Sequence, residues 1–364
     1  MTQLRDGKAN FLIVAAHVGP YLSVQPLENE LGSENIVFLL DDAAAKERAR
    51  LRLPYLSIDQ MNREWPSARG FLKEKGFKAV VIGTSENVPE PNIEALISDA
   101  ATTAGIPVFS VEDFPGNYRQ SPAGGLFGLF VEGPATVQLH VERGLDPELV
   151  RDTGNPRYDI LKDINTAALR VQTRRRLGLS DQRVLLWAGQ PDRDNSYLAL
   201  ERLIEGYSGG PVTLLFRAHP RDEFYLEGRY AQLLANADMN VIDVSAETSA
   251  IDLYCAADLV ATQFSSAALE ASHLGIPALL VLFDDLGKKY LRTNKGYELP
   301  PWCLDNCSFL VEDRNKIREV LGNALFNDAD RAEIIGNFRA RFSSDGGVAR
   351  SITEHIQATV SQQV

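Results

Sequence analysis

The chain of 364 residues is 45% apolar and 24% charged, which is typical of a soluble globular protein with room for two α/β domains. Its net charge of −12 argues against nonspecific binding to nucleic acid, whose phosphates repel an acidic surface, but local arginine clusters can still hold a small anion. The apolar run of six residues before His17 is too short for a signal peptide or a membrane span, so we expect a cytoplasmic protein without stable membrane insertion.

Short apolar segments alternate with helical segments along the first half of the chain. The predicted strands are residues 11–16, 35–40, 78–83, 106–111 and 128–133. Helical patterns, such as residues 91–105, lie between them. Strands that are apolar on both faces and separated by helices indicate a parallel sheet covered by helices on both sides.

The second half repeats this plan. Its predicted strands are residues 183–189, 212–218, 240–244, 258–262, 277–283 and 308–312. Turn chemistry at Gly154-Asn155-Pro156 places the domain boundary near residue 155. We therefore predict two doubly wound domains that face each other across a cleft, residues 1–155 and 156–335. A final helical segment, residues 336–364, is expected to cross back to the first domain.

Ligands of open parallel sheets bind outside the carboxyl ends of the strands, so the polar segments at these ends are the candidate sites. Gln190 follows one strand of the second half, and the next strand ends in RAHPRDE. There, Arg217, His219 and Arg221 form a cluster that suits phosphate, because guanidinium groups bind phosphate oxygens bidentately. The alternative is that these side chains only point to solvent.

The segment ATQFSSAALEASHLGIPAL, residues 261–279, contains a second candidate site. Gln263, Ser265 and Ser266 precede a predicted helix, whose free N–H groups together with the serine hydroxyls suit a diphosphate. Glu270 lies one turn further on, where a carboxylate can accept hydrogen bonds from ribose hydroxyls. The alternative is an ordinary serine N-cap followed by a surface glutamate.

The first domain offers candidate bases. His17 follows the first strand, where a neutral histidine can take a proton from a substrate hydroxyl, or can simply belong to a turn. Glu112 and Asp113 end another strand, and we take Asp113 with His17 as the catalytic candidates. The remaining histidines carry no predicted role: His140 and His355 are expected at the surface, and His273 in helix packing.

Three cysteines, Cys255, Cys303 and Cys307, are too few and too widely spaced for a disulfide framework, which indicates a reducing compartment. Cys303 and Cys307 lack the further ligands that a zinc site needs, so we predict no metal. The acidic segment at residues 192–194 is left as an alternative site for a divalent cation. No cofactor is predicted apart from a nucleotide-activated substrate.

Three segments resemble those of bacterial GT-B-fold enzymes, namely UDP-GlcNAc 2-epimerase-like proteins and capsule or teichoic-acid polymer transferases. They are DTGNPRYDIL in the linker, LLFRAHPRDE, and LYCAADLVATQFSSAALEASHLGIPAL. Their order and spacing also match over about residues 150–285, whereas the first domain matches only in its alternation of strands and helices. The resemblance places Asn155 and Arg157 at a hinge beside the cleft.

The resemblance implies two Rossmann-like domains, an N-terminal acceptor domain and a C-terminal domain that binds a nucleotide-activated donor. Carried over by position, His219 lies near the donor diphosphate. Ser265 and Ser266 donate hydrogen bonds to that diphosphate, and Glu270 holds the ribose.

The sequence also departs from these enzymes. Arg217 stands where relatives often carry lysine. The arginine-glutamate-asparagine element of the epimerases is missing after residue 190, and their Ser-Gly-Gly turn is Phe-Ser-Ser here. These departures disfavour epimerisation.

The leading hypothesis is a glycosyltransferase-like enzyme. It is expected to move a glycosyl or related group, without a metal, from a nucleotide diphosphate donor such as a UDP- or CDP-linked one to an acceptor hydroxyl. The setting would be synthesis of a surface polysaccharide or glycoconjugate. The alternatives are a nucleotide-sugar epimerase or hydrolase, and a GT-B-like binding protein without catalysis. The sequence leaves the sugar, the base, the acceptor, the stereochemical course and the oligomeric state open.

Overall fold

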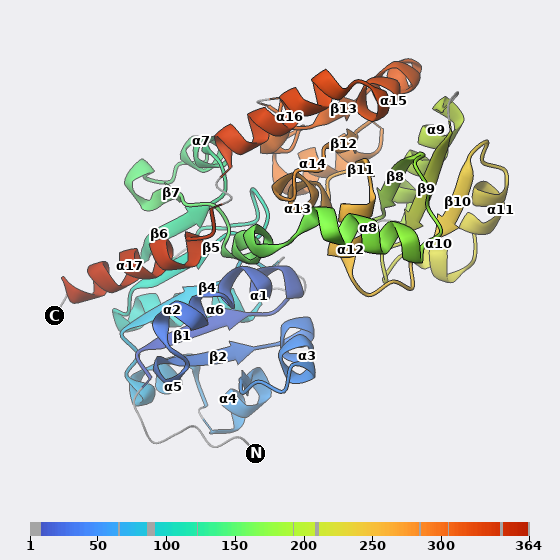
Figure 1. Cartoon of the computed structure of the whole chain (residues 1–364). Helices are drawn as coiled ribbons and strands as arrows, with labels where there is room; N and C mark the ends of the chain where they lie inside the picture. Colours follow the sequence, from blue (N-terminus) through green and yellow to red (C-terminus); the bar gives the residue numbers. More distant parts are fainter. Residues whose placement is uncertain are drawn as a thin grey trace. The chain divides into compact units, whose positions relative to one another are not determined.

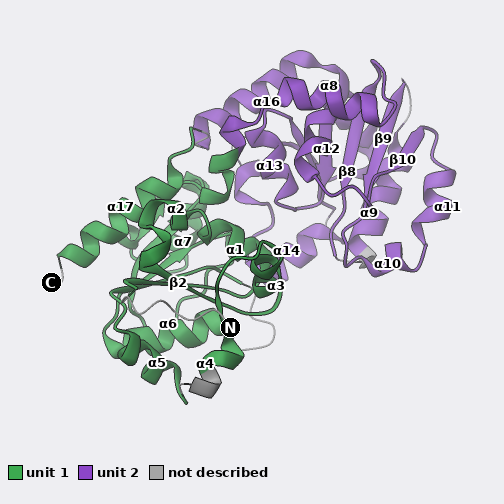
Figure 2. Cartoon of the chain, turned by 60° about the horizontal axis from the view of Figure 1, so that its bottom comes forward, with its two compact units in different colours: residues 1–160, 345–364 green, residues 161–344 purple. Residues whose placement is uncertain are grey.

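The computed structural model describes residues 9–64, 66–85, 92–121, 123–191, 193–207, 211–283, 285–304, 306–342 and 345–362. The chain divides into two compact units (Figure 2). Unit 1 comprises residues 1–160 together with residues 345–364, and unit 2 comprises residues 161–344.

Unit 1 is built on a seven-stranded parallel sheet in the order β3-β2-β1-β4-β5-β6-β7 (Figure 1). The strands are β1 Phe11–Ala15, β2 Ile36–Leu40, β3 Leu56–Ser57, β4 Ala79–Ile82, β5 Val108–Val111, β6 Leu126–Val131 and β7 Val150–Asp152. The helices are α1 Val18–Val24, α2 Leu27–Leu31, α3 Asp42–Arg50, α4 Ile58–Glu64, α5 Ala68–Lys75, α6 Ile93–Ala104, α7 Pro134–Glu142 and α17 Val348–Ser361. Short 3₁₀ segments span Ser33–Asn35, Pro147–Leu149 and Pro156–Asp163.

Strand β1 shows why this sheet is covered on both faces. All five of its residues are buried, and their side chains alternate between two apolar clusters. Ile13 packs in one cluster with residues of α1, α2 and α17, whereas Leu12 packs in the other with residues of α5 and α6. Helix α17 is anchored by Asp159, whose carboxylate accepts hydrogen bonds from Val348 N at 3.2 Å and Ala349 N at 2.9 Å.

Unit 2 is built on a six-stranded parallel sheet in the order β10-β9-β8-β11-β12-β13. The strands are β8 Arg183–Ala188, β9 Val212–Arg217, β10 Asn240–Asp243, β11 Leu259–Thr262, β12 Ala278–Val281 and β13 Phe309–Val311. The helices are α8 Thr166–Arg176, α9 Arg193–Gly206, α10 Glu223–Leu226, α11 Tyr230–Ala235, α12 Ala250–Ala256, α13 Ala267–His273, α14 Gly287–Lys295, α15 Ile317–Phe326 and α16 Asp328–Arg341. Two 3₁₀ segments, Pro301–Cys303 and Arg314–Lys316, complete it.

Both strand orders are those of doubly wound sheets, in which the first strands are added toward one edge of the sheet and, from the fourth strand on, toward the other edge. This reversal lies between β1 and β4 in unit 1, and between β8 and β11 in unit 2. The predicted parallel sheets are therefore confirmed. The sequence missed β3 and β7, because these strands contain only two and three residues.

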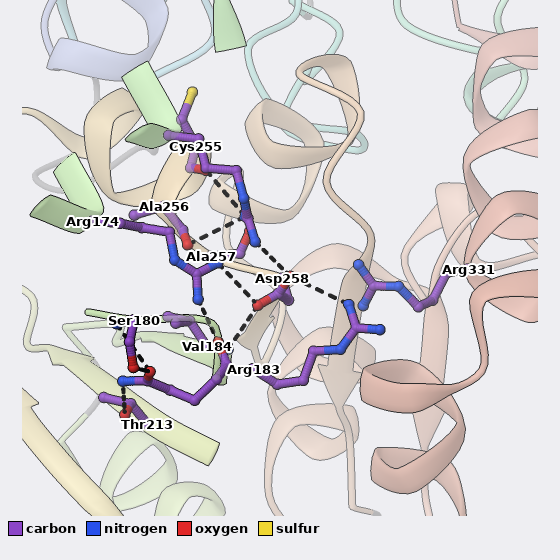
Figure 3. A network of polar contacts seen from close by, with 12 residues as sticks. Arg174, Ser180, Arg183, Val184, Thr213, Cys255, Ala256, Ala257, Asp258 and Arg331 are labelled. Atoms are coloured by element: carbon purple, nitrogen blue, oxygen red, sulfur yellow. Dashed lines mark hydrogen bonds and ion pairs between the residues drawn. The ribbon is translucent and has the colours of Figure 1, made fainter. Parts of the chain in front are cut away.

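A buried carboxylate near the amino end of β11 ties unit 2 together. Asp258 accepts hydrogen bonds from Val184 N and from Arg170 Nη2, each at 2.8 Å. Arg174 and Arg183 lie within 3.6 and 3.5 Å of the same carboxylate. Figure 3 shows the side chains of Arg174 and Arg183 turned toward Asp258. One carboxylate thus holds α8, β8 and β11 in register.

The prediction that His140 lies at the surface was wrong, whereas His355 is partly exposed. His140 is only 1% exposed, and its Nε2 lies 2.9 Å from Glu112 Oε1. His355 is half-buried and packs edge-on against the ring of Phe130. His273 packs against Phe338, as predicted.

None of the helices in the part of the chain that the structure describes is long and apolar enough to cross a bilayer.

Candidate functional site

The loops that follow β8 and β11 are joined directly at the switch point of unit 2. Gln190 is buried, and its Oε1 accepts a hydrogen bond from Phe264 N at 2.9 Å. Thr262 Oγ1 donates to Ala188 O at 2.8 Å. Gln263 is fully buried, and neither polar atom of its amide has a hydrogen-bond partner among the described residues. A buried amide without partners is costly, so Gln263 stands out among the polar residues of this loop.

The end of β9 lies against the same switch point. Gly189 N donates to Arg217 O at 2.9 Å, and a Cβ atom on Gly189 would lie 3.3 Å from His219 N. A glycine therefore permits the close approach of the two loops. Strands β9, β8 and β11 are consecutive in the sheet, so His219, Gln190 and Ser265 follow neighbouring strands at one edge.

The backbone fixes which nitrogen of His219 carries the proton. Arg221 N donates to His219 Nδ1 at 3.1 Å, so the neutral ring holds its hydrogen on Nε2. Burial lowers the pKa of His219 to about 4, and the positive charges of Arg221 and Arg217 add to this effect. At neutral pH the side chain is therefore an uncharged donor flanked by two guanidinium groups, an arrangement suited to the oxygen of a phosphate.

This environment predicts a pH effect on stability. The folded chain holds His219 neutral, whereas the unfolded chain protonates it below about pH 6.5, so the contribution of His219 to stability is full above that pH and is lost as pH falls toward 4. We expect His219→Asn to reduce the loss of unfolding free energy between pH 7.5 and pH 5, as measured by urea unfolding at both values. Equal losses in the two proteins would contradict this assignment.

The helix that follows the serines is short. Ser265 Oγ accepts from Ala267 N at 3.3 Å, whereas Ser266, at the N-cap of α13, makes no side-chain cap bond. Both serines and Glu270 are partly exposed, and α13 buries its other face through Leu269. The Ser266 hydroxyl thus makes no capping bond to α13, and Glu270 lies one helical turn after Ser266.

The predicted bases of unit 1 also follow strands around a switch point. His17 is the N-cap of α1, and its N donates to Ser85 Oγ at 3.0 Å, in the loop after β4. Asp113 follows β5, and its Oδ1 accepts from Thr84 Oγ1 at 2.6 Å. A Cβ atom on Gly19 would lie 2.6 Å from Asp113 Oδ2, so this carboxylate lies against the start of α1. Burial raises the pKa of Asp113, and its hydrogen bonds oppose that rise.

The structure places a further acid, Glu94, beside Ser85, although the sequence analysis did not single it out. Glu94 is 3% exposed, and its Oε1 accepts a 2.6 Å hydrogen bond from Ser85 Oγ. Burial raises the pKa of Glu94 to about 7, with a smaller contribution from the charge of Asp113. Glu94 therefore positions Ser85, which in turn holds the main chain at His17. Its only sequence signal is its place two residues after the helix cap Asn92.

Asn155 and Arg157 both lie in unit 1. Asn155 is buried, and its Nδ2 donates to Ser23 Oγ and to Glu112 O, both at 3.1 Å. These bonds fasten the linker to α1 and to the end of β5. The positive charge of Arg157 opposes the rise in the pKa of Asp113.

The alternative cation site at residues 192–194 involves Asp192 and the side chains of residues 193 and 194, which lie outside the described residues. Within the described residues, no group of three or more His, Cys, Asp or Glu side chains is arranged to hold a metal ion.

Comparison with known proteins adds a family and a fold. A family model described as CDP-Glycerol:Poly(glycerophosphate) glycerophosphotransferase matches residues 140–358. Among curated proteins, none matches this chain in sequence.

Several solved structures share the fold at low sequence identity. The UDP-GlcNAc 2-epimerase from Neisseria meningitidis bound to UDP-GlcNAc is 14% identical, with a TM-score of 0.66 over 96% of this chain and 99% of that chain. The Anabaena protein HepE in complex with UDP and glucose is 13% identical, with a TM-score of 0.64 over 96% and 99%. The wall teichoic acid polymerase TagF, soaked with CDPG, is 15% identical, with a TM-score of 0.55 over 97% and 89%. The fold is GT-B-like, with two Rossmann-like domains.

Proposed function

Because the chain belongs to the CDP-glycerol:poly(glycerophosphate) glycerophosphotransferase family, we propose that it transfers a glycerophosphoryl or related group from a nucleotide diphosphate donor to an acceptor hydroxyl. The family model covers β8 to β13, and thus the whole sheet edge that carries His219, Gln190 and Ser265. The observation that carries the proposal is the 3.1 Å hydrogen bond from Arg221 N to His219 Nδ1, which leaves Nε2 of the neutral ring as the donor, in a turn that also carries Arg217 and Arg221.

The reaction places two demands on the protein. The acceptor oxygen attacks the phosphorus that bears the glycerol, the bond from this phosphorus to the bridging oxygen breaks, and CMP leaves with the electron pair. The hydroxyl proton must go to a base, and the charge on the leaving phosphate must be stabilised. We assign the first role to His17, with Asp113 beside it, and the second to His219, Arg217 and Arg221.

The remaining candidates fall into supporting roles. Ser265 and Ser266 donate hydrogen bonds to the diphosphate, and Glu270 accepts hydrogen bonds from the ribose. Gln190 and Gln263 shape the loop beneath them. The proposal requires no cofactor besides the donor and no metal, since donors and guanidinium groups carry the charge. The acceptor is a hydroxyl of a growing polymer or glycoconjugate.

Nucleotide binding tests the donor site directly. We expect CDP to raise the Tm of the full chain and to bind in a calorimetric titration. His219→Ala and Glu270→Ala should each remove this stabilisation without changing the circular dichroism spectrum, because each deletes a ligand contact at the surface of a formed sheet edge. UDP, GDP and CMP serve as comparisons for the base and the phosphate number. Unchanged CDP binding in both variants would show that the nucleotide lies elsewhere.

A further inference from the structure

A buried chain of polar side chains connects the turn of His219 to the two loops at the switch point of unit 2. It begins at Asp222, which is fully buried. Asp222 N donates to His219 O at 2.9 Å, and Asp222 Oδ1 accepts from Phe224 N at 3.0 Å. The main chain of Asp222 therefore closes the turn that presents His219, while its carboxylate caps α10 directly after that turn. The other carboxylate oxygen, Oδ2, accepts a hydrogen bond from the hydroxyl of Tyr230 at 2.8 Å.

From Tyr230 the chain continues to the other loops. Tyr230, the first residue of α11, is 2% exposed. Burial raises the pKa of its hydroxyl, and a side-chain interaction with Ser196 of α9 opposes that rise, which is the effect of a hydrogen bond donated by Ser196. Ser196 is fully buried, and its Oγ accepts from Gln190 N at 3.2 Å. Gln190 in turn accepts from Phe264 N at 2.9 Å. The turn after β9 is thus joined to the loop after β8 through the hydroxyls of Tyr230 and Ser196, and the Gln190 side chain joins the loop after β8 to the loop after β11.

The direction of these bonds follows from the number of protons. A hydroxyl can donate only one hydrogen bond. The Tyr230 hydroxyl donates its hydrogen bond to Asp222, so it must accept the hydrogen bond that it shares with Ser196. The Ser196 hydroxyl donates its hydrogen bond to Tyr230, so it must act as the acceptor in its bond with Gln190 N, as the geometry shows. Each hydroxyl is therefore used once as donor and once as acceptor. Such a series strengthens each of its members and leaves unpaired groups when one is removed.

The ring of Tyr230 is held independently of its hydroxyl. It packs against Phe216 of β9 with ring centroids 4.8 Å apart, and against Tyr197 at 5.2 Å. Replacement by phenylalanine therefore keeps the packing and removes only the polar link. This separates a role in positioning from a role in filling the core.

We propose that Tyr230 is a positioning residue of the donor site, which sets His219 relative to the loops of Gln190 and Phe264 through Asp222 and Ser196. The inference rests on the proposed function in so far as those loops bind a nucleotide. The placement of His219 is also measurable without any ligand.

The test compares Tyr230→Phe with Tyr225→Phe. Tyr225 makes the same kind of bond, from its hydroxyl to Asp243 Oδ2 at 3.2 Å, but at an exposed position, and its ring also packs against Phe216. We expect Tyr230→Phe to weaken CDP binding and to lower kcat/KM for the donor by about tenfold, the change expected when one buried hydrogen bond is lost. Tyr225→Phe should leave both values unchanged.

Two further readouts make the result decisive. Ser196→Ala combined with Tyr230→Phe should weaken CDP binding no more than Tyr230→Phe alone, because both changes break one series of hydrogen bonds.

In the ligand-free protein with ¹³C-labelled histidine, Tyr230→Phe should shift the NMR signals of the His219 ring and the pH at which they titrate. These signals are assigned by their loss in His219→Asn. Failure of the wild type to bind CDP would overturn the proposed function, while shifted His219 signals would still support the link. A Tyr230→Phe protein with unshifted His219 signals would overturn the link, whatever the wild type binds.

Discussion

Replacement of His17 by glutamine should lower kcat for acceptor-dependent donor consumption by about 10²- to 10⁴-fold, the range typical for loss of a general base. The reason is that His17 follows β1 at the switch point of unit 1, where Ser85 holds its main chain by a 3.0 Å hydrogen bond. Glutamine keeps polarity and approximate size but cannot take up the proton of the acceptor hydroxyl. CDP binding should be unchanged, because the residues that we propose to contact the donor lie in unit 2.

The matched control is His355→Gln, which changes a half-buried histidine of the same unit that packs against Phe130. We expect its kcat to stay close to that of the wild type. Steady-state kinetics with saturating donor and acceptor, together with a CDP titration, check both variants. A His17→Gln protein that retains more than a tenth of wild-type kcat would remove His17 from the role of base and leave Asp113 as the candidate.

Replacement of Asp258 by alanine should lower the free energy of unfolding by about 3 kcal/mol or more, as expected when a buried charge pair loses one member. The carboxylate is 5% exposed and accepts from Val184 N and Arg170, while Arg174 and Arg183 lie close by. Without it, three guanidinium groups repel one another and a buried amide loses its acceptor.

Asp328→Ala is the control for this stability effect. Asp328 also pairs with Arg183, at 3.0 Å, but its side chain is 79% exposed, and exposed pairs contribute about 0–1 kcal/mol. Urea unfolding of the full chain, followed by circular dichroism, compares the two variants. A loss below 1 kcal/mol in Asp258→Ala would show that the arginines find other partners.

Much of the fold was visible in the sequence because parallel strands buried on both faces are continuous apolar runs. The same contrast led us to the proposed donor edge, since each apolar run ends abruptly in polar residues, as at Arg217 and Gln263. The sequence could not show that Gln190 accepts from Phe264 N, because this contact spans 74 residues of the chain.

Buried polar residues were the main source of error. His140 and Thr136 lie four residues apart on the inner face of α7, both 1% exposed, yet neither contributes to an apolar periodicity. Glu94, Ser196 and Tyr230 escaped notice for the same reason: their importance comes from partners that only the folded chain brings near.

The most direct test of the donor role is the product formed from CDP-glycerol by the full chain, with a glycerophosphate polymer as acceptor. Separation of the nucleotides by ion-exchange chromatography distinguishes the outcomes. Transfer of glycerophosphate predicts CMP release that depends on the acceptor and lengthens it by glycerophosphate units. CMP released equally without acceptor would indicate hydrolysis. The absence of any nucleotide product, or of acceptor growth, would contradict transfer.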